Sequence, residues 1–363
     1  IIVLDIFFYL VSFSLRIAYT LKKPLNKRIL NTRFICWLLF FYILIGIAPL
    51  QAQEIMTPMR EMYCKPGVEM KSPGKGVTIE YGLFPSYKIN SVAERKSQLN
   101  ANQHLLIKLK VPIINKPRMK ALVGFRHFRE AYDFGNIDIE DQWLFQNLEN
   151  KTLKNSRLSA YLTRSFSHKH YVGFKGELAY TGDYKGLIDF SKRYRHAFLV
   201  GVFGMKPHAN KEWGIGLVAR FGYRGNAVFP FLIYNQTFSK KWGIEFTVPV
   251  KMMVRYNISQ RSLFLAGLEF GSRQYSVDFI EKPADGPTGQ YNIRRAEVQL
   301  NIAFDQHIAS WFWFEVKTGY VRYLDSQFEG IKSQEEVDFN IKSADGIFFK
   351  FGIFVNPPKS FYK

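Results

Sequence analysis

The sequence predicts an all-β fold: a transmembrane antiparallel β-barrel of about 12 strands, or of 14, after a cleaved N-terminal signal peptide. Three observations predict it, namely a short apolar run near the N-terminus, alternation of apolar and polar residues from Val77 onward, and strands long enough to cross an outer membrane. Of the 363 residues, 47% are hydrophobic. This supply of apolar side chains predicts a folded chain rather than a disordered one.

The apolar run covers residues 34–47, with five basic residues before it, between residues 22 and 33, and Ala52 after it. A basic segment, a short apolar core and a small residue, in that order, are typical of a secretory signal peptide. The core is shorter than the roughly 20 residues that a membrane-spanning helix needs. We therefore expect residues 27–52 to be the signal peptide, with cleavage after Ala52.

The remaining residues divide into three parts. Residues 1–26 are largely apolar and precede any Met, so we interpret them as upstream sequence added by an over-extended gene start; a genuine first membrane helix is the alternative. We expect residues 53–76 to form an N-terminal periplasmic segment and residues 77–363 to form the barrel. The expected location of the protein is the outer membrane.

The chain is basic, with 50 Lys and Arg against 30 Asp and Glu, and it stays basic once residues 1–52 are removed. A basic chain suits anionic lipid head groups or nucleic acid, and export excludes the second. We expect outer-membrane lipids, lipopolysaccharide and the barrel-insertion machinery as partners, and we leave the oligomeric state open. Cys36 leaves with the signal peptide, so Cys64 has no partner for an internal disulfide.

The clearest alternation runs from Trp242 to Tyr256, where every even position is apolar and most odd positions are small, polar or charged. Its central ten residue steps cover roughly 23 Å along the membrane normal, at about 3.3 Å per step and a tilt near 45°. An outer-membrane barrel has an apolar band of about 25 Å between two aromatic girdles. We therefore expect Val248 at the bilayer centre, and Trp242 and Tyr256 in the girdles.

Further segments alternate in the same way, and a short helix is expected only within residues 130–155. The strand candidates are Val77–Asn90, Gln103–Val111, Ala121–Phe128, Leu158–Phe166, Tyr171–Tyr180, Ala197–Met205, Trp213–Arg224, Val228–Phe238, Trp242–Tyr256, Ser262–Phe279, Tyr291–Phe304, Trp311–Tyr323 and Ile347–Val355.

These thirteen candidates are an odd number, whereas single-chain bacterial barrels have an even one. Long loops lie on the outer side of such barrels, so they should all follow odd strands or all follow even strands. In this chain the long connections follow the third and fifth candidates but then the tenth and twelfth, so the pattern changes between the fifth and the tenth. One strand is therefore misdrawn in that interval. Ser262–Phe279, which is long, and Val228–Phe238, which contains Pro230, are the expected places. Once one strand is added or removed in that interval, every long loop follows an odd strand, as expected if the N-terminus starts in the periplasm.

The junction Leu50-Gln51-Ala52-Gln53, followed by alternating strands rich in Tyr, Phe and Gly, resembles the functionally uncharacterised outer-membrane β-barrel families of Bacteroidota. The resemblance covers about residues 34–363. It implies a barrel in the outer membrane of a Gram-negative bacterium, and it adds no cofactor and no site residues.

Charged residues of both signs lie on the polar faces of several strands, and in a membrane barrel they must face the lumen, because charge on the lipid side is costly. One interpretation is a passive channel for small polar solutes, and the other is a barrel filled by its own ion pairs, with a structural or assembly role. The expected lumen-lining residues are Lys175, Glu177, Glu245, Lys251, Arg255, Glu269, Arg273, Arg295, Glu297, Glu315 and Lys317.

The sequence carries no motif of a catalytic, cofactor or metal site. His168 and His170 share a predicted turn, but no third metal ligand can be named. Ser272 or Ser276 with a histidine is conceivable as a nucleophile, although no G-x-S-x-G motif is present. We therefore expect no enzyme and no cofactor, with an outer-membrane lipid-modifying enzyme as the third alternative.

Overall fold

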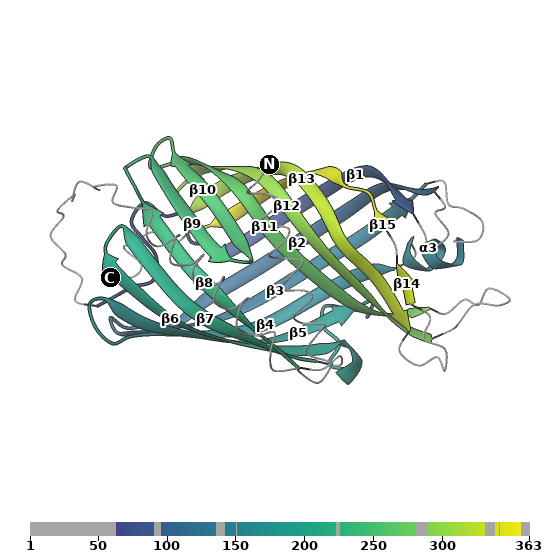
Figure 1. Ribbon diagram of the computed structural model, residues 1–363, viewed down its shortest axis with the longest axis horizontal. Coiled ribbons are helices and arrows are strands. Elements are labelled where there is room, and N and C mark those ends of the chain that lie inside the picture. Colours follow the sequence, from purple (N-terminus) through teal and green to yellow (C-terminus); the bar gives the residue numbers. More distant parts are fainter. Residues whose placement is uncertain are drawn as a thin grey trace, which may run out of the picture. The chain divides into compact units, whose positions relative to one another are not determined.

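The computed structural model describes residues 63–90, 96–135, 142–149, 151–222, 226–279, 289–330, 338–340 and 342–356. The signal peptide, its cleavage point and residues 1–26 lie outside this part of the chain. Within the described residues, fourteen antiparallel strands close into one barrel, which confirms the higher of the two expected strand counts (Figure 1). Each strand pairs with the next along the chain, and β16 closes the ring between β13 and β1.

The barrel strands are β1 Val77–Asn90, β2 Lys96–Asn115, β3 Met119–Phe134, β4 Thr152–Ser165, β5 His170–Gly182, β6 Arg195–His208, β7 Lys211–Gly222, β8 Ala227–Thr237, β9 Trp242–Val248, β10 Lys251–Asn257, β11 Ser262–Phe279, β12 Gly289–Ala309, β13 Phe312–Gly330 and β16 Gly346–Val355. The minor elements are β14 Asp338–Asn340, β15 Lys342–Ser343, the helix α3 Gln142–Glu149 and the 3-10 turn η2 Lys192–Tyr194. Helix α3 lies inside the interval in which the sequence predicts one.

The misdrawn strand is Trp242–Tyr256, the segment with the clearest alternation, and neither of the two suspected segments. It is a hairpin of β9 and β10 that turns at Pro249, which has no N–H to donate to a sheet. The alternation pattern does not reveal the turn, because cross-strand partners lie on the same face of the sheet. Here even positions pair with even positions, such as Ile244 with Val254, so the period-two pattern continues through the turn.

The hairpin also changes the expected places of three side chains. Trp242 and Tyr256 pair directly across β9 and β10, with ring centroids 4.6 Å apart, so they lie at one rim of the barrel rather than at opposite girdles. Val248 is the last residue of β9. It therefore lies at a turn and not in the middle of a strand that crosses the whole bilayer.

The outer face of the barrel is apolar. On β16 the alternate residues Ile347, Phe349 and Phe351 are exposed, whereas Phe348 and Lys350 between them are buried. A soluble protein would bury such a belt, so the belt indicates contact with lipid, and the barrel is an outer-membrane barrel as predicted. The long connections all follow odd strands, which also agrees with the prediction. In the described part of the chain, no helix has the length and apolar character needed to cross a bilayer.

The wall is low at β9 and β10, which have seven residues each, beside the 18 residues of β11. Beyond its pairing with β10, β11 reaches β5, where Ser276 pairs in parallel with Gly182. The two strands are not neighbours in the ring. A side chain at Gly182 would overlap the Ser276 carbonyl, so this close approach requires glycine.

Candidate functional site: the barrel interior

Alternation places one side chain in two from each strand inside the barrel, and many of the charged ones form ion pairs there. All eleven residues that the sequence assigns to the lumen face take part. They form five groups: Lys175 and Glu177 with Arg157; Glu245 with Arg255; Lys251 and Lys317 with Glu269; Arg273, Arg295 and Glu297 with Glu130; and Glu315 with Lys75.

The group around Glu130 crosses the interior. Glu130 lies on β3 and is fully buried, and its carboxylate accepts hydrogen bonds from Arg295 Nη2 at 2.6 Å and from Tyr275 Oη at 3.0 Å. Arg273 Nη1 is 3.4 Å from the same carboxylate and donates through Nη2 to Glu297 at 2.9 Å. These partners come from β11 and β12, which do not neighbour β3 in the ring. The sequence missed Glu130, which lies outside the strand predicted there.

An apolar core fills the barrel on the loop side of this group. It is a cluster of buried side chains from strands around the ring, including Phe84, Tyr291 and Phe348. Helix α3 adds Phe145 and Leu148, and the Phe145 ring lies 5.0 Å from that of Phe134. Figure 1 shows α3 at this end of the barrel. The core and the helix occupy the interior at the end of the long loops.

Residues 63–76 lie against the opposite end, where short turns join the strands. The carbonyl of Cys64 accepts a hydrogen bond from the Ser165 hydroxyl on β4, and the Gly67 N–H donates to Glu212 on β7 at 2.8 Å. Ser72 donates to Glu245 on β9 through its N–H at 2.8 Å and its hydroxyl at 2.7 Å. Lys75 pairs with Glu315 on β13.

This inner segment, residues 63–76, thus binds inward-facing residues around much of the ring. Residues 53–76 are expected from the sequence to be a periplasmic segment, and this stays a prediction; the structure attaches residues 63–76 to the short-turn end of the barrel. The reason is that three wall carboxylates need donors, and the segment supplies them. Burial raises the pKa of the Cys64 thiol, so this buried thiol stays neutral.

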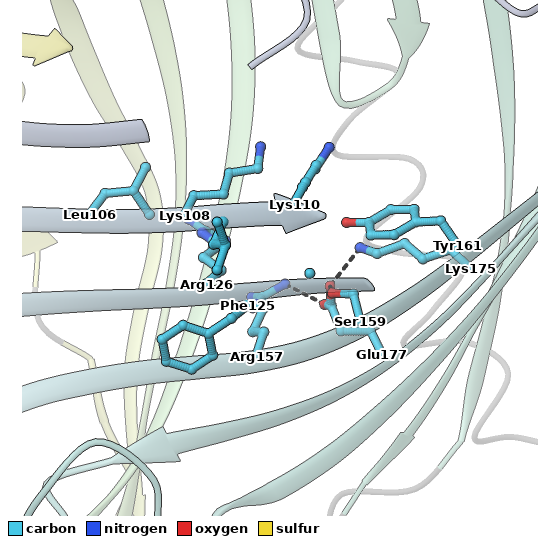
Figure 2. Close-up of a pocket in the computed structure, with 12 residues that line it drawn as sticks. Leu106, Lys108, Lys110, Phe125, Arg126, Arg157, Ser159, Tyr161, Lys175 and Glu177 are labelled. Carbon is cyan, nitrogen blue, oxygen red and sulfur yellow. Dashed lines mark hydrogen bonds and ion pairs between the residues drawn. The ribbon is translucent and has the colours of Figure 1, made fainter. Parts of the chain in front are cut away.

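A cavity of about 230 Å³ lies in the interior against β2, β3, β4 and β5. Five cationic side chains and one carboxylate line it: Lys108, Lys110, Arg126, Arg157, Lys175 and Glu177. Figure 2 shows Arg157 and Lys175 both turned to Glu177. The two N···O distances are 2.9 Å and 2.6 Å.

We call this cavity the cationic chamber. Lys110 lies over the Tyr161 ring, 5.1 Å from its centroid. Within the part of the chain that the structure describes, Lys108, Lys110 and Arg126 form no ion pair with an acid. The sequence missed these three residues, although Lys108 and Lys110 occupy alternate positions of a predicted strand.

The closed ring, the apolar outer face and the charged interior define the protein as an outer-membrane β-barrel. No protein-family model matches the chain, and no curated protein matches it. Solved structures of outer-membrane barrels are similar at low identity. A Pseudomonas aeruginosa FadL homologue has 7% identity and a TM-score of 0.39, over 78% of this chain and 90% of its own.

Two further solved structures are similar to this chain. The Pseudomonas putida toluene transporter TodX has 9% identity and a TM-score of 0.35, over 78% of this chain and 90% of its own. The outer-membrane protease OmpT from Escherichia coli has 8% identity and a TM-score of 0.22, over 80% of this chain and 100% of its own.

Proposed function

We propose that this chain is a transport barrel that passes small polar solutes through its charged interior and closes that interior at both ends. The observation that supports this proposal is the inner segment. A barrel that is filled only for stability needs no more than its wall side chains, whereas here a separate stretch of chain covers one mouth. Hydrogen bonds and an ion pair attach it, and water can replace such contacts at little net cost when the segment moves.

The cationic chamber indicates which class of solute this barrel would pass. TodX is a toluene transporter, and toluene is apolar. The interior described above carries buried charges of both signs and a chamber with five cations, which disfavours hydrocarbons and favours solutes that replace the water around those charges. We therefore propose polar rather than apolar cargo for this chain.

We further propose that the protein is not an enzyme. The Ser276 hydroxyl, one of the two conceivable nucleophiles, hydrogen-bonds to Asn292 Oδ1 at 2.9 Å and to the Arg193 carbonyl at 3.1 Å, not to a histidine. His170 hydrogen-bonds to Ser167 at 3.0 Å. The described residues include no group of three metal-ligating side chains.

The expected relatives and partners also belong to this proposal. We place the chain among the uncharacterised outer-membrane barrels of Bacteroidota, with outer-membrane lipids, lipopolysaccharide and the barrel-insertion machinery as partners. A barrel in this membrane needs that machinery to insert, and its apolar belt must contact lipid.

The test is a double substitution in the inner segment, Ser72→Ala with Lys75→Ala. It removes the hydroxyl contact to Glu245 and the ion pair with Glu315, and it leaves the wall unchanged. The two contacts contribute about 2 kcal/mol together, so the open population should rise roughly 30-fold. Single-channel recording in planar bilayers measures this as longer or more frequent openings.

Lys169→Ala is the matched control, because it removes the same charge from an exposed turn. It should leave the recordings unchanged. If neither the natural protein nor the double variant ever conducts, the barrel is a closed scaffold and the transport proposal is wrong.

A further inference from the structure

The cationic chamber contains a row of like charges. Lys108 on β2 pairs in register with Arg126 on β3, and Arg126 pairs with Arg157 on β4. Three cations thus lie directly opposite one another on adjacent strands, facing inward. Like charges at directly opposite positions destabilise a sheet. Glu177 neutralises only Arg157 of the three.

The next row supplies space beside these cations. Lys110 pairs with Gly124, Gly124 with Ser159, and Ser159 with Glu177. Gly124 has no side chain, and Ser159 has a small one whose hydroxyl is 3.1 Å from Glu177. The cavity therefore lies next to the cations, with Tyr161 at its side (Figure 2).

We propose that this chamber binds a small oxyanion, a carboxylate or a phosphate group, between Lys108, Lys110 and Arg126. A bound anion would offset the charges of Lys108, Lys110 and Arg126, with which no acid of the described chain forms an ion pair. The guanidinium of Arg126 offers two parallel donors, a geometry that matches carboxylate and phosphate oxygens, and the two ammonium groups add donors that can rotate.

The size of the chamber limits the ligand. A volume of about 230 Å³ is below the usual range of roughly 300–1,000 Å³ for drug-sized ligands. The occupant is thus an inorganic oxyanion or a short organic acid. This inference rests on the proposed transport function for its biological meaning, because it makes the transported solute an anion. The binding itself needs no transport.

Binding is measured by isothermal titration of the full-length protein in detergent at low salt, once with inorganic phosphate and once with propionate. We expect saturable binding of about one equivalent of at least one of the two. The arm that binds tells which source of the oxyanion the chamber takes. Binding should weaken as salt rises, because an exposed part of the attraction is screened.

The variant Lys108→Gln with Arg126→Gln should weaken that binding at least tenfold. Its control, Lys251→Gln, removes an interior cation that pairs with Glu269 outside the chamber and should change binding less than twofold. Thermal unfolding guards against misfolding. Without anion, the double variant should be as stable as the natural protein or more stable, since repulsion is removed. Added anion should raise the melting temperature of the natural protein only.

Absence of saturable binding in both arms overturns the proposal, and so does a double variant that binds like the natural protein. Binding without any conductance leaves the anion site standing and overturns only the transport function. Conductance without anion binding leaves the transport function standing and overturns the anion site.

Discussion

Changing Glu130 to Gln should lower the free energy of unfolding by about 3–5 kcal/mol, the largest loss that we expect from a single conservative change in the interior. Glu130 is 0% exposed, and Glu297 is the other buried acid of its group. Glutamine keeps the shape and part of the hydrogen bonding. It removes one of the two negative charges that balance Arg273 and Arg295, so the two buried cations share Glu297 and one positive charge of the group is left uncompensated.

Glu269→Gln is the matched control. Glu269 also lies between two cations, Lys251 and Lys317, but its side chain is 26% exposed. Water can then replace the lost partner, and we expect a change of about 0–1 kcal/mol. Urea titration of both variants in detergent gives the comparison. Equal losses would mean that the interior around Glu130 is as wet as that around Glu269.

A double substitution separates charge balance from shape. Glu130→Gln combined with Arg273→Gln restores neutrality, because Glu297 and Arg295 remain as a pair. We expect the double variant to be more stable than Glu130→Gln alone. Strictly additive losses would show that the two side chains do not interact across the barrel.

The fold could be predicted because alternation is a local property. The alternation within each strand indicates which of its sides faces lipid, and most strands were predicted within a few residues of the bounds in the structure. The β9–β10 hairpin was missed because its partners have the same parity, so a turn and a continuous strand give the same pattern. Only the even strand count and the positions of the long loops showed that a strand was missing.

The interior could be predicted only in part. Lumen-facing charges follow from alternation, but their partners do not. Glu130 meets Arg273 and Arg295 across the barrel, at sequence separations of 143 and 165, and no local pattern encodes that pairing. The inner segment has no alternation, so its place depends on donors required by Glu212, Glu245 and Glu315 on distant strands.

The membrane position of the barrel is tested best at Phe349. The sequence placed Val248 at the bilayer centre, but Val248 lies at a hairpin turn. Phe349 is 41% exposed on the outer face of β16, six residues from Val355, which pairs with Phe312 at the turn side of the barrel. At about 3.3 Å per residue and a tilt near 45°, six residues cover roughly 14 Å, or about half of the apolar band.

Phe349→Arg should therefore lower the free energy of unfolding in lipid vesicles by about 2–4 kcal/mol, since its charge would lie near the midplane. Phe312→Arg replaces the same residue type, 52% exposed, at the rim, where a charge reaches the head groups. The expected loss there is about 0–1 kcal/mol. Denaturant titrations of both variants in vesicles measure the difference. Equal losses at the two positions would place the bilayer centre elsewhere on β16, and a harmless Phe349→Arg would show that this face does not meet hydrocarbon.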